Sequence, residues 1–203
     1  MRVTNVSEHA IEMSLQSFPQ NKLLETKFKY PFNMSFLDYP SPDDNAVLVF
    51  MMGCEHACDG CQNLLFQNPD YDEQTKQFTR EELAHAIRQA CDKFRTKKIV
   101  LTGGDPLFVK NLKSTVCILE DLRTDYDICI YTGCNIIDVV EYSFIRGFKY
   151  IVCGAYDSTK ATRSEKTDDY VQLASTNQEI YDGGFFCMTN RDGRMYFNQR
   201  RKQ

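Results

Sequence analysis

Four short apolar runs alternate with segments of helical periodicity through the middle of the chain. The first run is apolar at every position, as in a strand covered on both faces. The runs cover residues 46–52, 98–102, 127–132 and 149–153. Apolar residues three or four positions apart predict helices over residues 79–94, 112–122 and 136–147. This alternation predicts a parallel sheet with right-handed crossovers.

Capping residues mark the expected ends of these helices. Thr79 and Glu82 match a capping box at the start of the first helix. Asn111 and Asn135 stand where they can cap the second and third helices, and Gly147 is placed to end the third.

Each apolar run ends at a glycine. The four are Gly53, Gly103, Gly133 and Gly154. Parallel α/β folds bind ligands at the carboxyl ends of their strands, because the loops converge there. Glycine at such a position lets a ligand approach the backbone closely. We therefore expect one shared site at this edge of the sheet.

Chain length limits the architecture. At 203 residues the chain is too short for a complete eight-unit barrel of about 250 residues, so we predict an α/β fold with a partial, open βα barrel. Residues 1–30 are predicted to form an N-terminal extension of unassigned role, and residues 31–203 a single domain. Residues 155–169 predict a surface loop, and residues 181–188 with 191–197 a hairpin-like C-terminal segment.

Composition narrows the possible partners and location. The net charge of -4 argues against nucleic-acid binding, and the basic ending at residues 200–202 is interpreted as a solvated tail. No apolar run resembles a signal peptide or reaches the length of a membrane span, so a cytoplasmic protein is expected. Nine cysteines in such a protein indicate metal or catalytic use. Four lie in apolar patterns and are expected to be inert: Cys91, Cys117, Cys129 and Cys153.

Three cysteines follow the first run at the spacing C-x3-C-x2-C: Cys54, Cys58 and Cys61. Structural zinc usually takes two separated ligand pairs, and His56 offers a fourth ligand only on a tight loop. A redox pair of Cys58 and Cys61 leaves Cys54 unexplained. In an iron–sulfur cubane, three thiolates hold three irons and leave the fourth iron open to a small amino acid-like chelator. The cubane is therefore the preferred interpretation.

The cysteine triad, followed one βα unit later by Gly-Gly-Asp-Pro at residues 103–106, resembles the radical S-adenosylmethionine superfamily. Within it, the chain is similar to the activating enzymes of the anaerobic (class III) ribonucleotide reductase over roughly residues 32–180. The matching stretches are residues 53–63, 101–107, 131–133, 154–156 and 174–178. The chain differs from that pattern at Gln62, usually an aromatic residue, and at Cys134, usually tyrosine.

This resemblance implies a 4Fe-4S cluster held by the three cysteines, with S-adenosyl-L-methionine on its open iron. It implies that Gly103 and Gly104 seat the methionine amino group and that backbone around Gly60 and Gln62 lies near the adenine. Cys61, Asp105 and Thr132 complete the cofactor-binding residues that it implies. Tyr131, Asn177 and Gln178 are weaker candidates, and the last two are as readily explained as loop residues.

The implied reaction is the activation of a protein substrate. The cofactor is cleaved reductively, and hydrogen is removed from a glycine of the large anaerobic ribonucleotide reductase subunit. A one-electron donor such as flavodoxin is implied as a second partner. Two alternatives stay open: a radical enzyme acting on a small molecule, similar to a deazaguanine-forming synthase, and a non-catalytic iron–sulfur or zinc protein.

Overall fold

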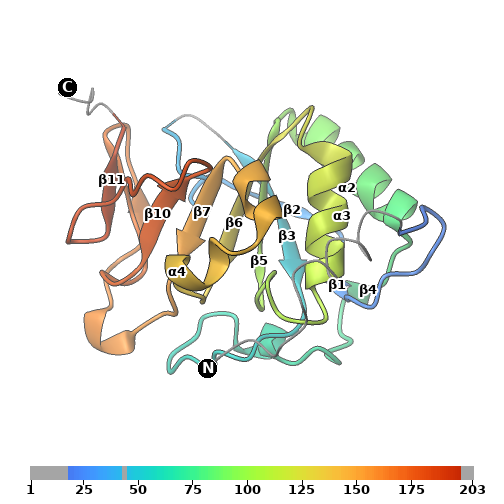
Figure 1. The fold of residues 1–203 in the computed structure, drawn as a ribbon, viewed down its shortest axis with the longest axis horizontal. Coiled ribbons are helices and arrows are strands. Elements are labelled where there is room, and N and C mark those ends of the chain that lie inside the picture. Colours follow the sequence, from blue (N-terminus) through green and yellow to red (C-terminus); the bar gives the residue numbers. More distant parts are fainter. Residues whose placement is uncertain (1–17, 43–44, 198–203) are drawn as a thin grey trace.

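Four parallel strands form the centre of the main sheet, as the apolar runs predict. The computed structural model describes residues 18–42 and 45–197 (Figure 1). The parallel strands lie in the order β7-β6-β5-β3, with bounds β3 (Ala46–Met51), β5 (Lys98–Gly103), β6 (Asp127–Thr132) and β7 (Tyr150–Cys153). The predicted α/β fold with an open, partial barrel is confirmed.

Antiparallel strands extend both edges of this sheet. On one side β10 (Glu179–Asp182) pairs with β7. On the other side β1 (Phe28–Lys29) and β2 (Asn33–Ser35) both pair with β3, and β4 (Thr75–Lys76) pairs with β1. The described residues thus form one mixed sheet of eight strands, open at both edges.

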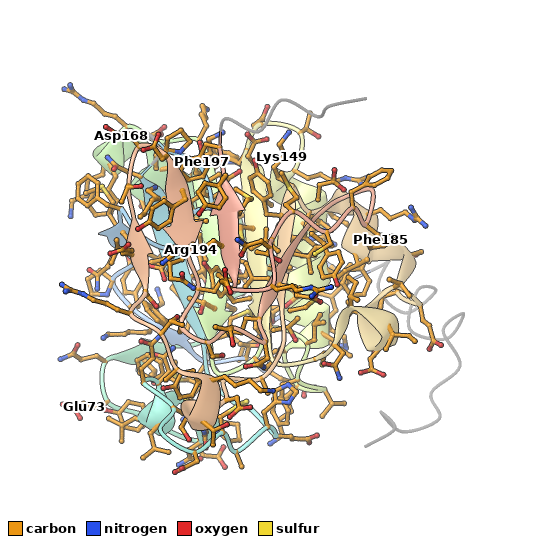
Figure 2. All side chains as sticks on the ribbon, turned by 90° about the vertical axis from the view of Figure 1, so that its left-hand side faces the viewer. Glu73, Lys149, Asp168, Phe185, Arg194 and Phe197 are labelled. Atoms are coloured by element: carbon orange, nitrogen blue, oxygen red, sulfur yellow. The ribbon has the colours of Figure 1, made fainter. Side chains whose placement is uncertain are left out.

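The two faces of the main sheet pack against different layers, helices on one side and a small sheet on the other. Val47, Val49 and Met51 belong to the core under helices α2 (Arg80–Phe94) and α3 (Leu112–Leu122). Leu48 points to the opposite face, which packs against a small antiparallel sheet. Its strands are β8 (Glu165–Lys166), β9 (Tyr170–Gln172) and β11 (Arg194–Tyr196). Figure 2 shows Arg194 and this small sheet in front of the strands of the main sheet.

Helix α2 begins and packs as its sequence predicts. The Thr79 hydroxyl accepts a hydrogen bond from the backbone of Glu82, whose carboxylate accepts one from the Thr79 backbone. Leu83, Ile87 and Cys91 are buried on its inner face. None of the helices in the described part of the chain has the length and apolar character needed to cross a membrane.

The predicted helix over residues 136–147 is wrong. The structure has a single turn, α4 (Ile136–Val139), and then a separate 3-10 helix, η2 (Ser143–Gly147). Between them Tyr142 is extended, and this break lets Ile145 reach the core, where it is fully buried. Four of the first five residues, at positions 136–140, are β-branched, and such side chains lose rotamer freedom in a helix.

The described residues nearest the two ends of the chain also belong to the domain. Leu24 and Phe28 are buried in the core under α2 and α3, while residues 1–17 and the basic ending lie outside the described residues. The division of the chain at residue 30 stays a prediction. The C-terminal segment is antiparallel as expected, but its two strands join different sheets instead of pairing with each other: β10 pairs with β7 and β11 with β9.

Candidate functional site

Three cysteines line a cavity at the carboxyl end of the parallel strands. Cys54, Cys58 and Cys61 are all half-buried and lie on the loop that follows β3. The cavity has a volume of about 390 Å³. Among the described residues that line it, these three are the cysteines, so three thiols converge on one space.

The ends of all four parallel strands contribute to this cavity, as the four glycines predict. Residues of the β5 and β6 ends that line it are Thr102, Gly103, Gly104, Tyr131, Thr132 and Gly133. The cysteine loop adds Gly60 and Gln62, and the end of β7 adds Gly154. Of the cofactor-binding residues implied by the resemblance, only Asp105 is set back from the cavity wall.

Gly103 and Gly104 are required by contacts between strand ends. Gly103 has a φ of +112°, and a Cβ there would lie 2.7 Å from the backbone nitrogen of Met51. A Cβ on Gly104 would lie 2.2 Å from the carbonyl oxygen of Gly53 and 2.6 Å from that of Phe66. Backbone atoms cannot yield as a flexible side chain can, so protein packing alone demands glycine at both positions.

The Asp105 carboxylate joins three strand ends. It is 2% exposed, and its Oδ1 accepts a hydrogen bond from the Leu107 backbone at 2.7 Å. Its Oδ2 lies 3.0 Å from Thr132 Oγ1, 2.9 Å from the Gly133 nitrogen and 2.7 Å from His56 Nε2. Both oxygens are therefore held by protein donors, and the carboxylate connects the loops after β3, β5 and β6.

His56 is paired with Asp105. Its side chain is 27% exposed, and Cys134 Sγ lies 3.8 Å from the same ring nitrogen. The hydrogen bond with Asp105 is the main cause that raises the pKa of His56 to about 10, followed by the contact with Cys134. Because its carboxylate partner favours the protonated ring, His56 carries positive charge at neutral pH.

A second grouping of ligand atoms overlaps the cysteine triad. One ligand atom each from Cys54, His56 and Asp105 lie within 4.8 Å of one another, close enough to hold a single ion. Burial raises the pKa of Cys54 to about 11, so the thiol is protonated in the metal-free chain. Metals bind the thiolate, and any metal bound here therefore releases a proton from Cys54.

Asn111 holds the backbone beside the site through hydrogen bonds, a role that the sequence did not indicate. Its side chain does not cap α3. It is fully buried, and its Nδ2 donates to the carbonyl oxygens of Asp105 at 2.9 Å and Gly53 at 3.4 Å. No sequence signal separates this role from a cap, because both place asparagine directly before a helix.

The expected surface loop over residues 155–169 forms a wall of the cavity. Tyr156, Thr162 and Ser164 line the cavity. In the short helix η3 (Ser158–Lys160), Ser158 Oγ lies 3.4 Å from Asp59 Oδ2 on the cysteine loop. The loop therefore contacts the segment that carries the three cysteines.

The weaker candidates have structural partners. Asn177 Nδ2 donates to the carbonyl oxygen of Ala155 at 2.8 Å, and Gln178 Nε2 donates to that of Gly154 at 3.2 Å. The Tyr131 hydroxyl donates a hydrogen bond to the Asp38 carbonyl oxygen at 2.8 Å. Asn177 and Gln178 hold the turn after β7, so the loop interpretation accounts for their hydrogen bonds.

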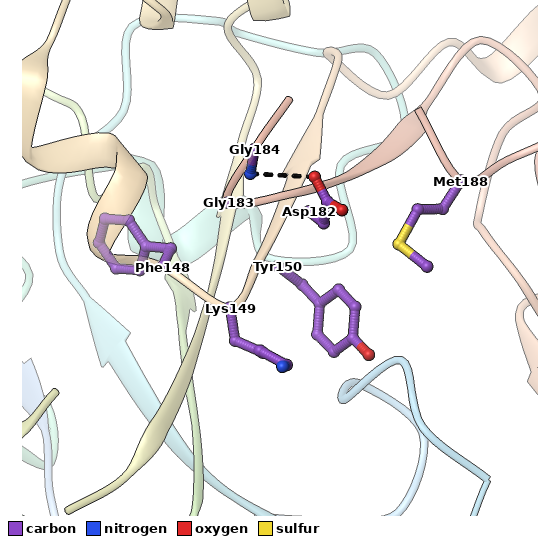
Figure 3. A pocket seen from close by; sticks show the side chains of 7 residues that line it. All are labelled: Phe148, Lys149, Tyr150, Asp182, Gly183, Gly184 and Met188. Atoms are coloured by element: carbon purple, nitrogen blue, oxygen red, sulfur yellow. Dashed lines mark hydrogen bonds between the residues drawn. The ribbon is translucent and has the colours of Figure 1, made fainter. Parts of the chain in front are cut away.

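A separate cavity, also of about 390 Å³, lies at the other end of β7. Lys149, Tyr150, Asp182 and Met188 point toward it (Figure 3). Asp182 Oδ1 accepts a hydrogen bond from the Gly184 backbone at 3.0 Å. This cavity has no cysteine and no strand-end glycine of the parallel sheet among its described lining residues, so the chemistry belongs to the first cavity.

Comparison with known proteins bears on the same region. A family model described as a 4Fe-4S single cluster domain matches residues 45–181. Relatives from Enterobacteria phage T4 and Pasteurella multocida are both named anaerobic ribonucleoside-triphosphate reductase-activating protein. The phage protein is 27% identical over 120 residues, 58% of this chain and 74% of its own length. The Pasteurella protein is 26% identical over 147 residues, 66% of this chain and 84% of its own length.

A relative of the same name from Vibrio cholerae is 27% identical over 95 residues, which is 45% of this chain and 59% of the relative. The resemblance indicated by the cysteine triad and the Gly-Gly-Asp-Pro turn is therefore confirmed. The matched range contains all three cysteines and every strand end that lines the cavity.

Proposed function

Since the chain belongs to the 4Fe-4S single cluster domain family, we propose that it is a radical S-adenosylmethionine enzyme that activates an anaerobic ribonucleotide reductase. In this proposal the enzyme removes a hydrogen atom from a glycine of the reductase and leaves a stored glycyl radical there. The names of the three relatives support the choice of partner. A one-electron donor such as flavodoxin is part of the same proposal.

The observation that carries the proposal is the set of thiols around the cavity. Three half-buried cysteines stand at one edge, and the other described lining residues contain no further thiol. A cubane has four irons, so this donor set fits a cluster with one iron free of protein thiolate. When bound, the cluster and S-adenosylmethionine supply the electron and the carbon radical that the reaction needs.

In this proposal the chain's own residues bind the cluster, orient the cofactor and form the walls of the cavity. Cys54, Cys58 and Cys61 would hold the cluster, and the backbone of Gly103 and Gly104 would face the methionine end of the cofactor. The loop over residues 155–164 forms another side of the cavity.

Two more residues of the cavity have roles in the proposal. The Thr132 hydroxyl is occupied, since it donates to Asp105 and accepts from the Cys134 backbone, so Thr132 acts through its shape and position. Gly60 has a φ of +73° and lies beside Tyr156, where a backbone without side chain leaves room for the adenine end.

The experiment is anaerobic reconstitution with iron and sulfide, followed by reduction in the presence of S-adenosylmethionine. We expect cluster assembly and release of 5′-deoxyadenosine. Cys54→Ala should abolish both, whereas Cys187→Ala, at an exposed thiol outside the cavity, should leave them unchanged. Full activity in the Cys54 variant, or no 5′-deoxyadenosine from the intact chain, would contradict the catalytic proposal.

The partner is tested separately. A reductase with a candidate radical glycine, mixed with the active enzyme, should develop a glycyl EPR doublet. Cofactor cleavage without the doublet would reject the protein substrate while leaving the radical chemistry in place, and would favour a small-molecule substrate.

A further inference from the structure

We propose that His56 is a positioning residue that fastens the cysteine loop to the ends of β5 and β6. The cysteine loop, residues 53–63, leaves β3 and carries all three thiols. His56 lies between the first two of them, and its backbone nitrogen is 3.4 Å from Cys54 Sγ.

The first contact of His56 is the hydrogen bond to Asp105. Nε2 lies 2.7 Å from Asp105 Oδ2, across 49 positions of sequence. Asp105 is itself immobilised, because it also accepts from Leu107, Thr132 and Gly133 and is almost fully buried. A hydrogen bond to a fixed, charged acceptor is among the stronger ones in proteins, so it can hold a loop in place.

The second contact is the packing of the imidazole on Gly133. A Cβ on Gly133 would lie 2.3 Å from Cδ2 of the His56 ring and 2.6 Å from its Cγ. Gly133 has no left-handed backbone conformation to explain its identity, unlike Gly53, Gly103 and Gly154. The ring of His56 explains it: a Cβ at this position would overlap the imidazole as it packs against the end of β6.

Positioning and ligation by His56 are distinguished by substitution. Nε2 is bonded to Asp105, so a ligand role would use Nδ1 or would break this hydrogen bond, and variants have to separate the two roles. His56→Gln keeps an N–H donor at a similar reach, whereas His56→Leu keeps the bulk and removes the donor. A positioning role is therefore rescued by glutamine, and a ligand role is not.

The first measurement uses the metal-free chain. Hydrogen exchange should be followed at the backbone amides of Cys54 and Cys61, which donate to Gln67 and Cys58. We expect roughly tenfold faster exchange at these amides in His56→Leu, with helix α2 unchanged and His56→Gln close to the native protein. His85→Leu makes the same change on the exposed face of α2 and is the matched control.

Gly133→Ala is an independent variant that leaves His56 intact but displaces its ring. It should reproduce the exchange pattern of His56→Leu. Native exchange at Cys54 and Cys61 in both variants would overturn the proposal, and so would faster exchange confined to α2.

The second measurement depends on the proposed function. After anaerobic reconstitution, the rate of iron loss to a chelator should rise about tenfold in His56→Leu and stay near native in His56→Gln. The fraction of reduced cluster whose EPR spectrum changes on addition of S-adenosylmethionine should fall in the leucine variant. Iron loss that is faster than native to the same extent in the leucine and glutamine variants would assign His56 as a ligand and reject positioning, and native rates in both would also reject positioning. Failure of the native chain to assemble a cluster would reject the proposed function and leave the exchange result standing.

Discussion

At Gly104 the packing of the site leaves no room for any side chain. A methyl group there would lie 2.2 Å from the Gly53 carbonyl oxygen, on the loop that leads to Cys54. Gly104→Ala should lower the free energy of unfolding by about 2 kcal/mol or more, because two backbones must separate. Chemical denaturation measures this loss. Gly184→Ala, where the nearest atoms are 3.3 Å away and belong to side chains, is the control and should change stability less.

The buried thiol of Cys117 predicts that the folded protein loses stability at alkaline pH. Burial raises the pKa of Cys117 to about 11 from an ordinary value of 9.0. The contribution of the Cys117 thiol to the free energy of unfolding is fully present below pH 9. It is lost as the pH rises toward 11, because the thiol ionises in the unfolded chain while it stays protonated in the folded one. The free energy of unfolding, measured by denaturant titration at several pH values, should fall less steeply over this range in Cys117→Ala. Equal slopes in the variant and the native chain would contradict this prediction.

Between elements, a buried ion pair joins α2 to α3. Arg80 Nε and Nη2 lie 2.8 Å and 2.7 Å from the two carboxylate oxygens of Asp121. The two side chains are only 10% and 15% exposed, so removing Asp121 leaves the buried Arg80 with the more exposed Glu120, at 3.0 Å, as its remaining carboxylate partner. Asp121→Ala should lower the free energy of unfolding by roughly 3 kcal/mol.

Its control is the pair of Lys27 and Asp72, at 3.0 Å, in which Asp72 is 84% exposed. Asp72→Ala should change the free energy of unfolding by less than about 1 kcal/mol. A similar loss in both variants would mean that burial does not decide the strength of the Arg80 pair.

For the molecule as a whole, the small sheet completes the core. Met195 of β11 is 2% exposed and packs with Val171 against the face of the main sheet opposite the helices. Met195→Ala should lower the free energy of unfolding by about 2–4 kcal/mol. The next residue, Tyr196, is 37% exposed, and Tyr196→Ala should cost less because the side chains of a strand alternate between faces. Equal losses would show that the small sheet does not bury Met195 as described.

The elements that the sequence predicted well have strong local signals. The run before Gly53 is apolar at every position, and the capping box at Thr79 and Glu82 marks the start of α2 within one residue. The third helix was mispredicted because its apolar spacing fits a helix while its β-branched residues oppose one. The small sheet was not predicted, because its strands are two or three residues long and carry no period.

The sequence by itself determined the parallel sheet, the cysteine loop after the first strand and the shared edge at which Gly53, Gly103, Gly133 and Gly154 meet. Periodicity and motif spacing are local properties, so they can be read along the chain. Only the tertiary structure decided that Asp105 faces His56 and that Asn111 turns into the site. Such hydrogen bonds join groups whose neighbours are set by packing, and a buried polar side chain takes whichever partner the folded core brings within reach.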